Sequence, residues 1–227
     1  MFAKLSFLIP MLCLPFFVSG QTQINCGGIS QVIPHFTKGD NEILTDQPLI
    51  NKKILEPITL SASAFEIRML YFVNIYQITV VISCTDSSVK VTSYGTHIIP
   101  KSMISKEILS NYIDGGSYTY QNDTTLRFFY NKETTLKPVS NLSWNEILSG
   151  LVKNHFFDLP SQAALDKIAL KYNPKASKPM DAGFEWFEIK AGDQYRYYKM
   201  GEDYEGIPAI AKYVQYKQNI INLLSFH

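Results

Sequence analysis

The chain has 227 residues, of which 46% are hydrophobic and 18% charged, with 21 Lys and Arg against 20 Asp and Glu. This balance argues against nucleic acid or an anionic membrane surface as the main partner, because both select a basic surplus. The length is enough for one sizeable core or two small ones.

Residues 1–20 match the three-part layout of a secretory signal peptide, and we exclude them from the fold. Lys4 precedes an apolar run from Leu5 to Val18, and the small residues Ser19 and Gly20 follow. A membrane anchor is the alternative, but the run is shorter than the roughly 20 residues that a spanning helix needs. We therefore expect cleavage before Gln21 and an exported mature chain without a transmembrane segment, periplasmic, at the cell surface or secreted.

The mature chain keeps two cysteines, Cys26 and Cys84, since Cys13 lies in the leader. An even count in an oxidising compartment favours a disulfide, which would clamp the N-terminal segment onto the rest of the fold. The alternatives are two buried thiols, or a reactive Cys26 for which His97 is a base by residue type alone.

Residues 21–64 mix Gly, Pro and polar residues with short apolar pairs, which predicts a loop-rich cover with one or two edge strands. The strongest pattern follows in 65–84. Apolar residues hold the odd positions up to Val73 and the even positions from Tyr76 onward. A reversal at Asn74-Ile75 would pair Val73 with Tyr76 and place all ten apolar side chains on one face of an antiparallel pair.

The opposite face of this pair would be mostly wet, with one face of the sheet buried and one solvated. It carries the polar residues Glu66, Arg68, Gln77, Thr79 and Ser83, with Leu70, Phe72 and Val81 among them. Because Ile resists positive φ, a longer loop or a bulge at Asn74 is the alternative to a two-residue turn. The stretch from Val89 to Tyr94 alternates again and extends the pair to a three-stranded meander around 65–94.

A helix is predicted from 102 to 113, ended by Asp114-Gly115-Gly116. A hairpin then spans 117–131 and turns at Asn122-Asp123. Its predicted register pairs Tyr118 with Arg127, which would allow a cation–π contact, and pairs Tyr120 with Thr125.

The polar segment 131–143 is the candidate boundary within an otherwise single domain of residues 21–227. Ser143 and Glu146 form a capping box that opens a helix. A shorter helix is predicted from Ser161 to Tyr172, and a final helix begins near Pro208.

A third hairpin spans 184–200 and turns at Gly192-Asp193. One of its faces would hold three pairs: Trp186 with Lys199, Glu188 with Tyr197, and Lys190 with Tyr195. The other face would hold Glu185 with Met200, Phe187 with Tyr198, and Ile189 with Arg196. Glu185 and Glu188 are not expected to act together, because their odd separation places them on opposite faces.

No motif for catalysis or phosphate binding occurs, so the catalytic residues are unknown and no cofactor or metal is expected. The acidic loop with Glu202, Asp203 and Glu205 lacks the regular alternation of a Ca²⁺ loop, and we favour a solvated loop. His97 and His155 lack converging partners in sequence, so each is interpreted as a histidine at an element end.

Aromatic residues beside charges on the hairpins are the main binding signal. Rigid amphipathic rings suit a protein or carbohydrate partner, while cross-strand packing under the C-terminal helix is the alternative. The residues predicted to bind a ligand are Trp186, Tyr195, Tyr197, Lys199, Tyr118, Tyr120 and Arg127.

The sequence therefore predicts an α+β fold, in which an antiparallel sheet of hairpins is covered by three or four helices. We expect an exported, non-enzymatic binding or interaction protein that uses the aromatic hairpin faces. The alternatives are a secreted hydrolase acting on an extracellular polymer, and a structural envelope protein. Two carboxylates in one cleft, or a histidine within hydrogen-bond reach of a carboxylate, would favour the hydrolase.

Overall fold

The computed structural model describes most of the chain between Gln21 and Phe226. The described residues are 21–36, 49–50, 53–73, 76–100, 105–120, 124–131, 134–138, 141–174, 185–200 and 207–226. The predicted leader, the hairpin tip at Asn122-Asp123 and the acidic loop at 202–205 lie outside these residues.

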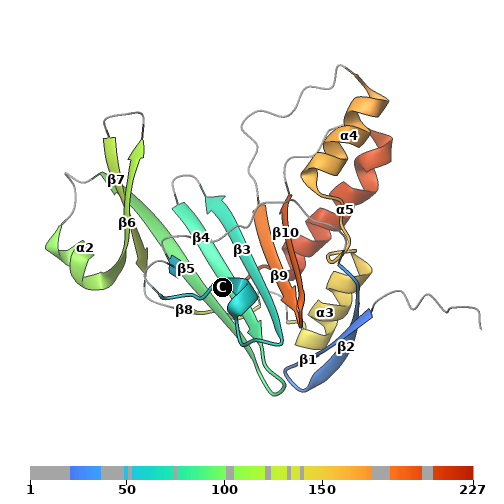
Figure 1. The fold of residues 1–227 in the computed structure, drawn as a ribbon, viewed down its shortest axis with the longest axis horizontal. Helices are drawn as coiled ribbons and strands as arrows, with labels where there is room; N and C mark the ends of the chain where they lie inside the picture. The colour runs from blue at the N-terminus through green and yellow to red at the C-terminus, as the bar shows by residue number, and fades with distance from the viewer. Residues whose placement is uncertain are drawn as a thin grey trace, which may run out of the picture.

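One antiparallel sheet dominates the described fold (Figure 1). Its strands are β3 (Phe65–Val73), β4 (Tyr76–Cys84), β5 (Val89–Pro100), β6 (Tyr112–Tyr120), β7 (Thr124–Asn131), β8 (Thr134–Thr135), β9 (Glu185–Ala191) and β10 (Gln194–Met200). Across the sheet the order is β10-β9-β3-β4-β5-β7-β6, and β8 pairs with β5. The predicted α+β class with a sheet built from hairpins is therefore confirmed.

The central pair has the predicted register. Phe65 lies opposite Cys84 and Val73 opposite Tyr76, with every pair between them in step. Their apolar face is buried in the main core, where Phe65, Ile67 and Ile82 are at most 1% exposed. The change of parity within this segment thus sets the core side of the sheet.

The other two hairpin predictions have different outcomes. β9 and β10 pair as predicted, with Phe187 opposite Tyr198 and Trp186 opposite Lys199. In the β6–β7 hairpin the predicted register is wrong by one residue, because Tyr118 lies opposite Leu126 rather than Arg127. A bulge at Asp114 to Gly116 shifts the ladder there, so the glycines do not end a helix.

The described helices are α2 (Lys106–Asn111), α3 (Trp144–Lys153), α4 (Gln162–Tyr172) and α5 (Pro208–Leu223). The last three confirm the predicted helices, and α3 carries the expected capping box of Ser143 and Glu146. The helix predicted over 102–113 ends at Asn111, because Tyr112 already begins β6. No helix among the described residues is both long and apolar enough to cross a bilayer.

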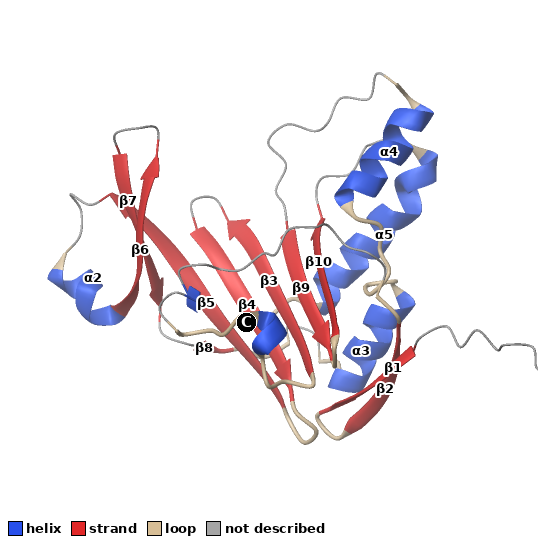
Figure 2. Ribbon diagram, in the orientation of Figure 1, coloured by secondary structure: helices blue, strands red, loops and turns tan. Residues whose placement is uncertain are grey.

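Helices α3 and α5 cover the core face near β9 and β10, while α2 lies at the opposite edge beside β6 and β7 (Figure 2). Ile147, Leu148 and Leu151 of α3 and Ile220 of α5 join the main core cluster. The α4–α5 pair adds a smaller cluster around Ala169 and Ile210. Hydrophobic burial on this side therefore holds sheet and helices together.

The opposite face of the central strands is not wet, which corrects the prediction. Glu66, Arg68 and Thr79 are all buried there. Residues 49–50 and 53–63 cover this face, since Leu49 clusters with Val81 and Tyr94 and the 3-10 helix η1 (Ile58–Leu60) lies in front of the sheet in Figure 1. The central strands are thus covered on both faces, by helices on one and by a smaller segment on the other.

The N-terminal strands form a sheet of their own rather than edges of the large one, which corrects a further expectation. β1 (Gln21–Cys26) and β2 (Ile29–Pro34) pair through a Gly27-Gly28 turn in which both glycines have positive φ. Such φ values suit glycine in a tight hairpin turn. The hairpin still lies against the main core, because Ile24 and Ile33 are buried in it.

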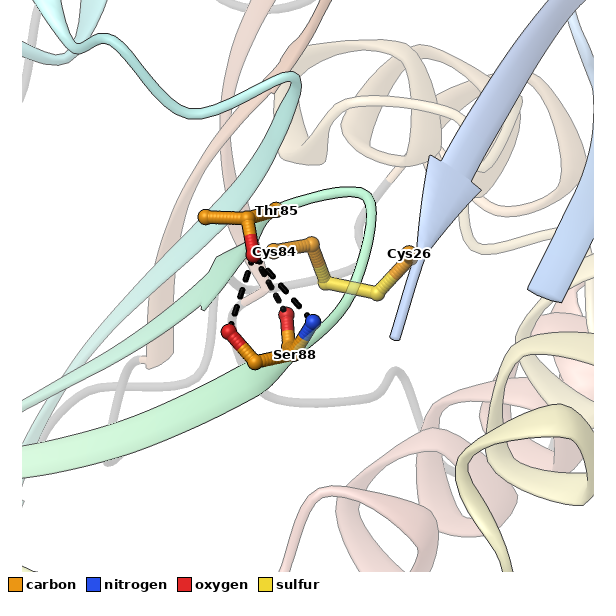
Figure 3. The surroundings of a disulfide bond; sticks show 4 residues. All are labelled: Cys26, Cys84, Thr85 and Ser88. Atoms are coloured by element: carbon orange, nitrogen blue, oxygen red, sulfur yellow. Dashed lines mark hydrogen bonds between the residues drawn. A yellow bond between two sulfur atoms is a disulfide. The ribbon is translucent and has the colours of Figure 1, made fainter. Parts of the chain in front are cut away.

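A disulfide between Cys26 and Cys84 fastens this hairpin, as predicted (Figure 3). Beside it, Gly27 N–H donates to the Thr85 carbonyl at 2.9 Å. The turn that follows Cys84 is closed by hydrogen bonds between Thr85 and Ser88, which include Thr85 N–H to the Ser88 carbonyl at 2.9 Å. The bridge therefore joins two ordered turns.

Replacing both cysteines by serine should lower the free energy of unfolding by about 4 kcal/mol, because the bridge closes a loop of 58 residues. Equilibrium urea unfolding without reductant measures this. Wild-type protein unfolded in the presence of dithiothreitol is the matched control and should approach the variant. A double variant as stable as the oxidised wild type would contradict the clamp.

Candidate functional site

The third hairpin gathers its predicted ligand-binding residues on the face opposite to α3 and α5. Trp186 lies opposite Lys199, and Tyr195 and Tyr197 follow at alternate positions of β10. Lys199 Nζ is 5.6 Å from the centroid of the Trp186 ring, a cation–π contact. Both of these side chains are half-buried, so this end of the face retains solvent contact.

Tyr197 differs, because it lies in a buried row that crosses five strands. The row is Thr92, Val81, Arg68, Glu188 and Tyr197, from β5 to β10. Tyr197 is 4% exposed and Glu188 is 1% exposed. Cross-strand packing thus accounts for the burial of Tyr197, on the face opposite to the C-terminal helix, and its binding role stays a prediction.

A network of charged side chains occupies the same face. Arg68 Nε donates to Glu66 Oε1 at 2.7 Å, with both side chains buried. The Ser61 hydroxyl donates to the second oxygen of Glu66, and the Lys190 ammonium donates to the Ser61 carbonyl. Ser61, directly after η1, is therefore hydrogen-bonded to side chains of the sheet through both its own side chain and its backbone carbonyl.

Tyr195 completes the network through its hydroxyl, which donates to Glu188 Oε1 at 3.0 Å. Burial raises the pKa of Tyr195 well above its ordinary value, and the negative charge of Glu188 and the hydrogen bond to it raise the pKa further. Tyr195 is thus held as a neutral donor.

The charges of this network balance. Glu66 and Glu188 supply two carboxylates, and Arg68 and Lys190 supply two cations. Buried charges persist when they are paired and hydrogen-bonded in this way. The two carboxylates lie in a packed face among compensating cations, so we interpret the network as structural rather than as a catalytic pair.

Three predicted residues belong to the other hairpin. The backbones of Tyr118, Tyr120 and Arg127 lie in β6 and β7, with Tyr120 opposite Thr124 and Arg127 opposite Ser117. Their side chains lie outside the described residues. That they bind a ligand stays a prediction, but the opposition of Tyr118 and Arg127 on which the stacking depended is wrong.

A cavity of about 200 Å³ lies on the core side of the sheet, between β3, β9 and the end of α5. Most of its lining is apolar, and two polar residues interrupt it. The lining residues are Met69, Glu185, Phe187, Ile221, Leu224, Ser225 and Phe226.

The end of the chain forms one wall of this cavity. α5 stops at Leu223, and Leu224 N–H still donates to the Ile220 carbonyl at 2.9 Å. Phe226 then pairs with Pro138 in a β-bridge and stacks on Trp144, with ring centroids 6.2 Å apart. The residues after α5 are therefore held by Pro138 and Trp144 where they line the cavity.

Glu185 connects the cavity to a cation. Its Oε2 lies 3.7 Å from Nζ of Lys217, which lies on α5 about one turn before the lining residue Ile221. Glu188 lies on the other face of β9, within the charged network. The predicted placement of these two carboxylates on opposite faces of the strand is therefore confirmed.

A second polar cluster lies where α3 ends. His155 Nδ1 is 3.2 Å from Asp158 Oδ2, and the His155 ring lies 4.8 Å from that of Tyr216. His155 has a φ of 57°, at a position that normally favours glycine. Its N–H donates to the Val152 carbonyl and the next N–H donates to Leu151, the Schellman pattern.

The hypothesis of a reactive thiol can be settled. The reactive pair of Cys26 and His97 is wrong, because Cys26 is in the disulfide and His97 instead packs edge-on against Tyr112 at 4.8 Å. Among the described residues no three His, Cys, Asp or Glu side chains gather as a metal site.

Sequence reasoning missed the cavity. Met69 and Phe187 were expected in the core, and both are there, but nothing in the spacing shows that α5 leaves a gap beside them. The pairing of Phe226 with Trp144 joins positions far apart in the chain and has no local signal.

Comparison of the chain with protein-family models, curated proteins and solved structures finds no match. The function proposed below therefore rests on the sequence and on the described residues.

Replacing Tyr195 by phenylalanine should reduce the loss of stability at alkaline pH. Below about pH 10 the tyrosine is neutral in both states. Above that value the unfolded chain releases the proton while the raised pKa keeps it on folded Tyr195, so stability falls as pH rises.

Urea unfolding midpoints measured from about pH 8 to 11 test this, since that range spans the ordinary tyrosine pKa. Tyr198→Phe is the matched control on the same strand, because burial also raises the pKa of Tyr198. Each variant should lose part of the wild-type slope. An unchanged slope for Tyr195→Phe would contradict the raised pKa of Tyr195.

Proposed function

We propose that this protein is an exported, non-enzymatic binding protein whose small ligand occupies the cavity between β3, β9 and the end of α5. The supporting observation is the cavity itself, which is largely apolar with Glu185 and Ser225 as its polar residues. Small-molecule sites typically combine an apolar concave wall with a few polar groups that orient the ligand.

Export is supported by the leader-like residues 1–20 and by the Cys26–Cys84 disulfide, since disulfides persist in oxidising compartments. The near-zero net charge is compatible with a small ligand and gives no support to nucleic acid.

The aromatic hairpin face supports a weaker proposal, in which a protein or carbohydrate contacts Trp186 and Lys199. These two side chains are half-buried and retain solvent contact, whereas Tyr197 and the network beneath it are packed. The accessible aromatic area is therefore smaller than the sequence suggested.

Binding in the cavity should change the fluorescence of Trp144. Phe226 lines the cavity and stacks on Trp144, and the chain has two tryptophans in all. In a Trp186→Phe background, titration with toluene should therefore report the cavity through Trp144 alone.

Ile221→Phe should abolish the response, because the larger side chain fills the cavity from its lining. Val214→Phe is the matched control, since Val214 lies on α5 but packs against the smaller cluster. A wild-type response in Ile221→Phe, or none in the Trp186→Phe protein, would overturn the proposal.

A secreted hydrolase is the second candidate, and the bond between His155 and Asp158 favours it. A carboxylate on Nδ1 orients the imidazole so that Nε2 can act as a general base. The positive φ of His155 also fits a residue kept for function at a position suited to glycine. Against it, both side chains are substantially exposed, at 50% and 34%.

His155→Gly should leave stability unchanged or raise it by up to about 1 kcal/mol, because glycine adopts positive φ without steric penalty. Urea unfolding measures this. A hydrolase would lose turnover of extracellular polymers in this folded variant, while Asn154→Ala serves as the neighbouring control. Equal turnover in wild type and His155→Gly would exclude the dyad.

A further inference from the structure

We infer that the cavity selects a neutral, single-ring ligand that donates a hydrogen bond, the chemistry of a simple phenol. This rests on the proposed function and specifies the ligand of the same cavity. Three features of the lining support it: the hydrogen-bonding direction of its polar groups, their charge balance and the volume.

Both polar residues of the lining present acceptors. The Ser225 hydroxyl donates its proton to the Ile221 carbonyl at 2.8 Å, which leaves its lone pairs to accept. The carboxylate of Glu185 accepts and cannot donate. A ligand that offered only acceptors could form no hydrogen bond with these oxygens.

The charge near the cavity is already balanced. Lys217 Nζ lies 3.7 Å from Glu185 Oε2, so the carboxylate has a countercharge. A carboxylate offers about four acceptor positions, and a ligand hydroxyl can therefore add to this contact without displacing Lys217. A charged ligand would instead bring an uncompensated charge against apolar walls, which is unfavourable.

The volume is sufficient for a ligand of one ring. A dry apolar cavity of about 150 Å³ holds benzene, and this one measures about 200 Å³. One ring with one or two small substituents therefore fits. Phe187, Phe226 and Met69 provide the aromatic and thioether contacts that an aromatic ring favours.

The test compares three ligands of similar shape by isothermal titration calorimetry: p-cresol, 4-methylanisole and toluene. p-Cresol should bind about tenfold more tightly than 4-methylanisole, because a hydrogen bond to a charged acceptor is gained. Benzylamine and benzoate, of similar size and opposite charge, should bind more weakly than p-cresol.

Glu185→Gln should reduce the preference for p-cresol and leave toluene affinity unchanged. Ser225→Ala is a second, milder variant that should also reduce the preference, in case Glu185→Gln fails to fold. Thermal unfolding of each variant establishes that it is folded before binding is measured.

The possible results separate the two levels of the proposal. Equal binding of p-cresol, 4-methylanisole and toluene overturns the donor requirement while the binding function stands. Tighter binding of benzylamine or benzoate overturns the requirement for a neutral ligand. Binding of none of the five compounds overturns the cavity as a ligand site, and the proposed function with it.

Discussion

The antiparallel pairing of β3 with β4 is the constraint on which the rest of the structure depends. Because side chains alternate along a strand, the change of parity between Val73 and Tyr76 lets both strands send their apolar residues to one side. A register slip of one residue would turn the apolar side chains of one strand away from the core and bring its polar side chains, such as Arg68, into it. β9 and β5 then extend the sheet on either edge of this pair with the same sidedness.

The second face shows how a sheet with alternating charges can still be covered. Glu66, Arg68 and Glu188 would be costly to bury singly, but their pairing and the bonds through Ser61 offset the loss of hydration. The cover formed by residues 49–50 and 53–63 is short, so hydrogen bonds between named residues take the place of a large buried apolar area. The charged face is consequently held by specific contacts, and little of it is left accessible to a ligand.

Sequence periodicity predicted the sheet well where the signal is local. The registers of β3–β4 and β9–β10 follow from alternation and turn residues, and the capping box at Ser143 marks the start of α3. Sequence periodicity failed where a segment distant in the chain decides which residues are buried. The burial of Glu66 depends on Ser61 and its neighbours. The register error in the second hairpin is local, since Tyr120 pairs with Thr124 rather than with the predicted Thr125.

The candidate site shows why function was harder to predict than fold. Glu185 and Glu188 lie on one strand, and the period of two sends one to the cavity and the other into the charged network. Their separate surroundings are fixed by α5 on one side and by residues 58–63 on the other. On our proposal, Glu185 meets apolar walls beside Lys217 and orients a ligand, whereas Glu188 is bonded to Tyr195, lies across the sheet from Arg68 and stabilises the fold.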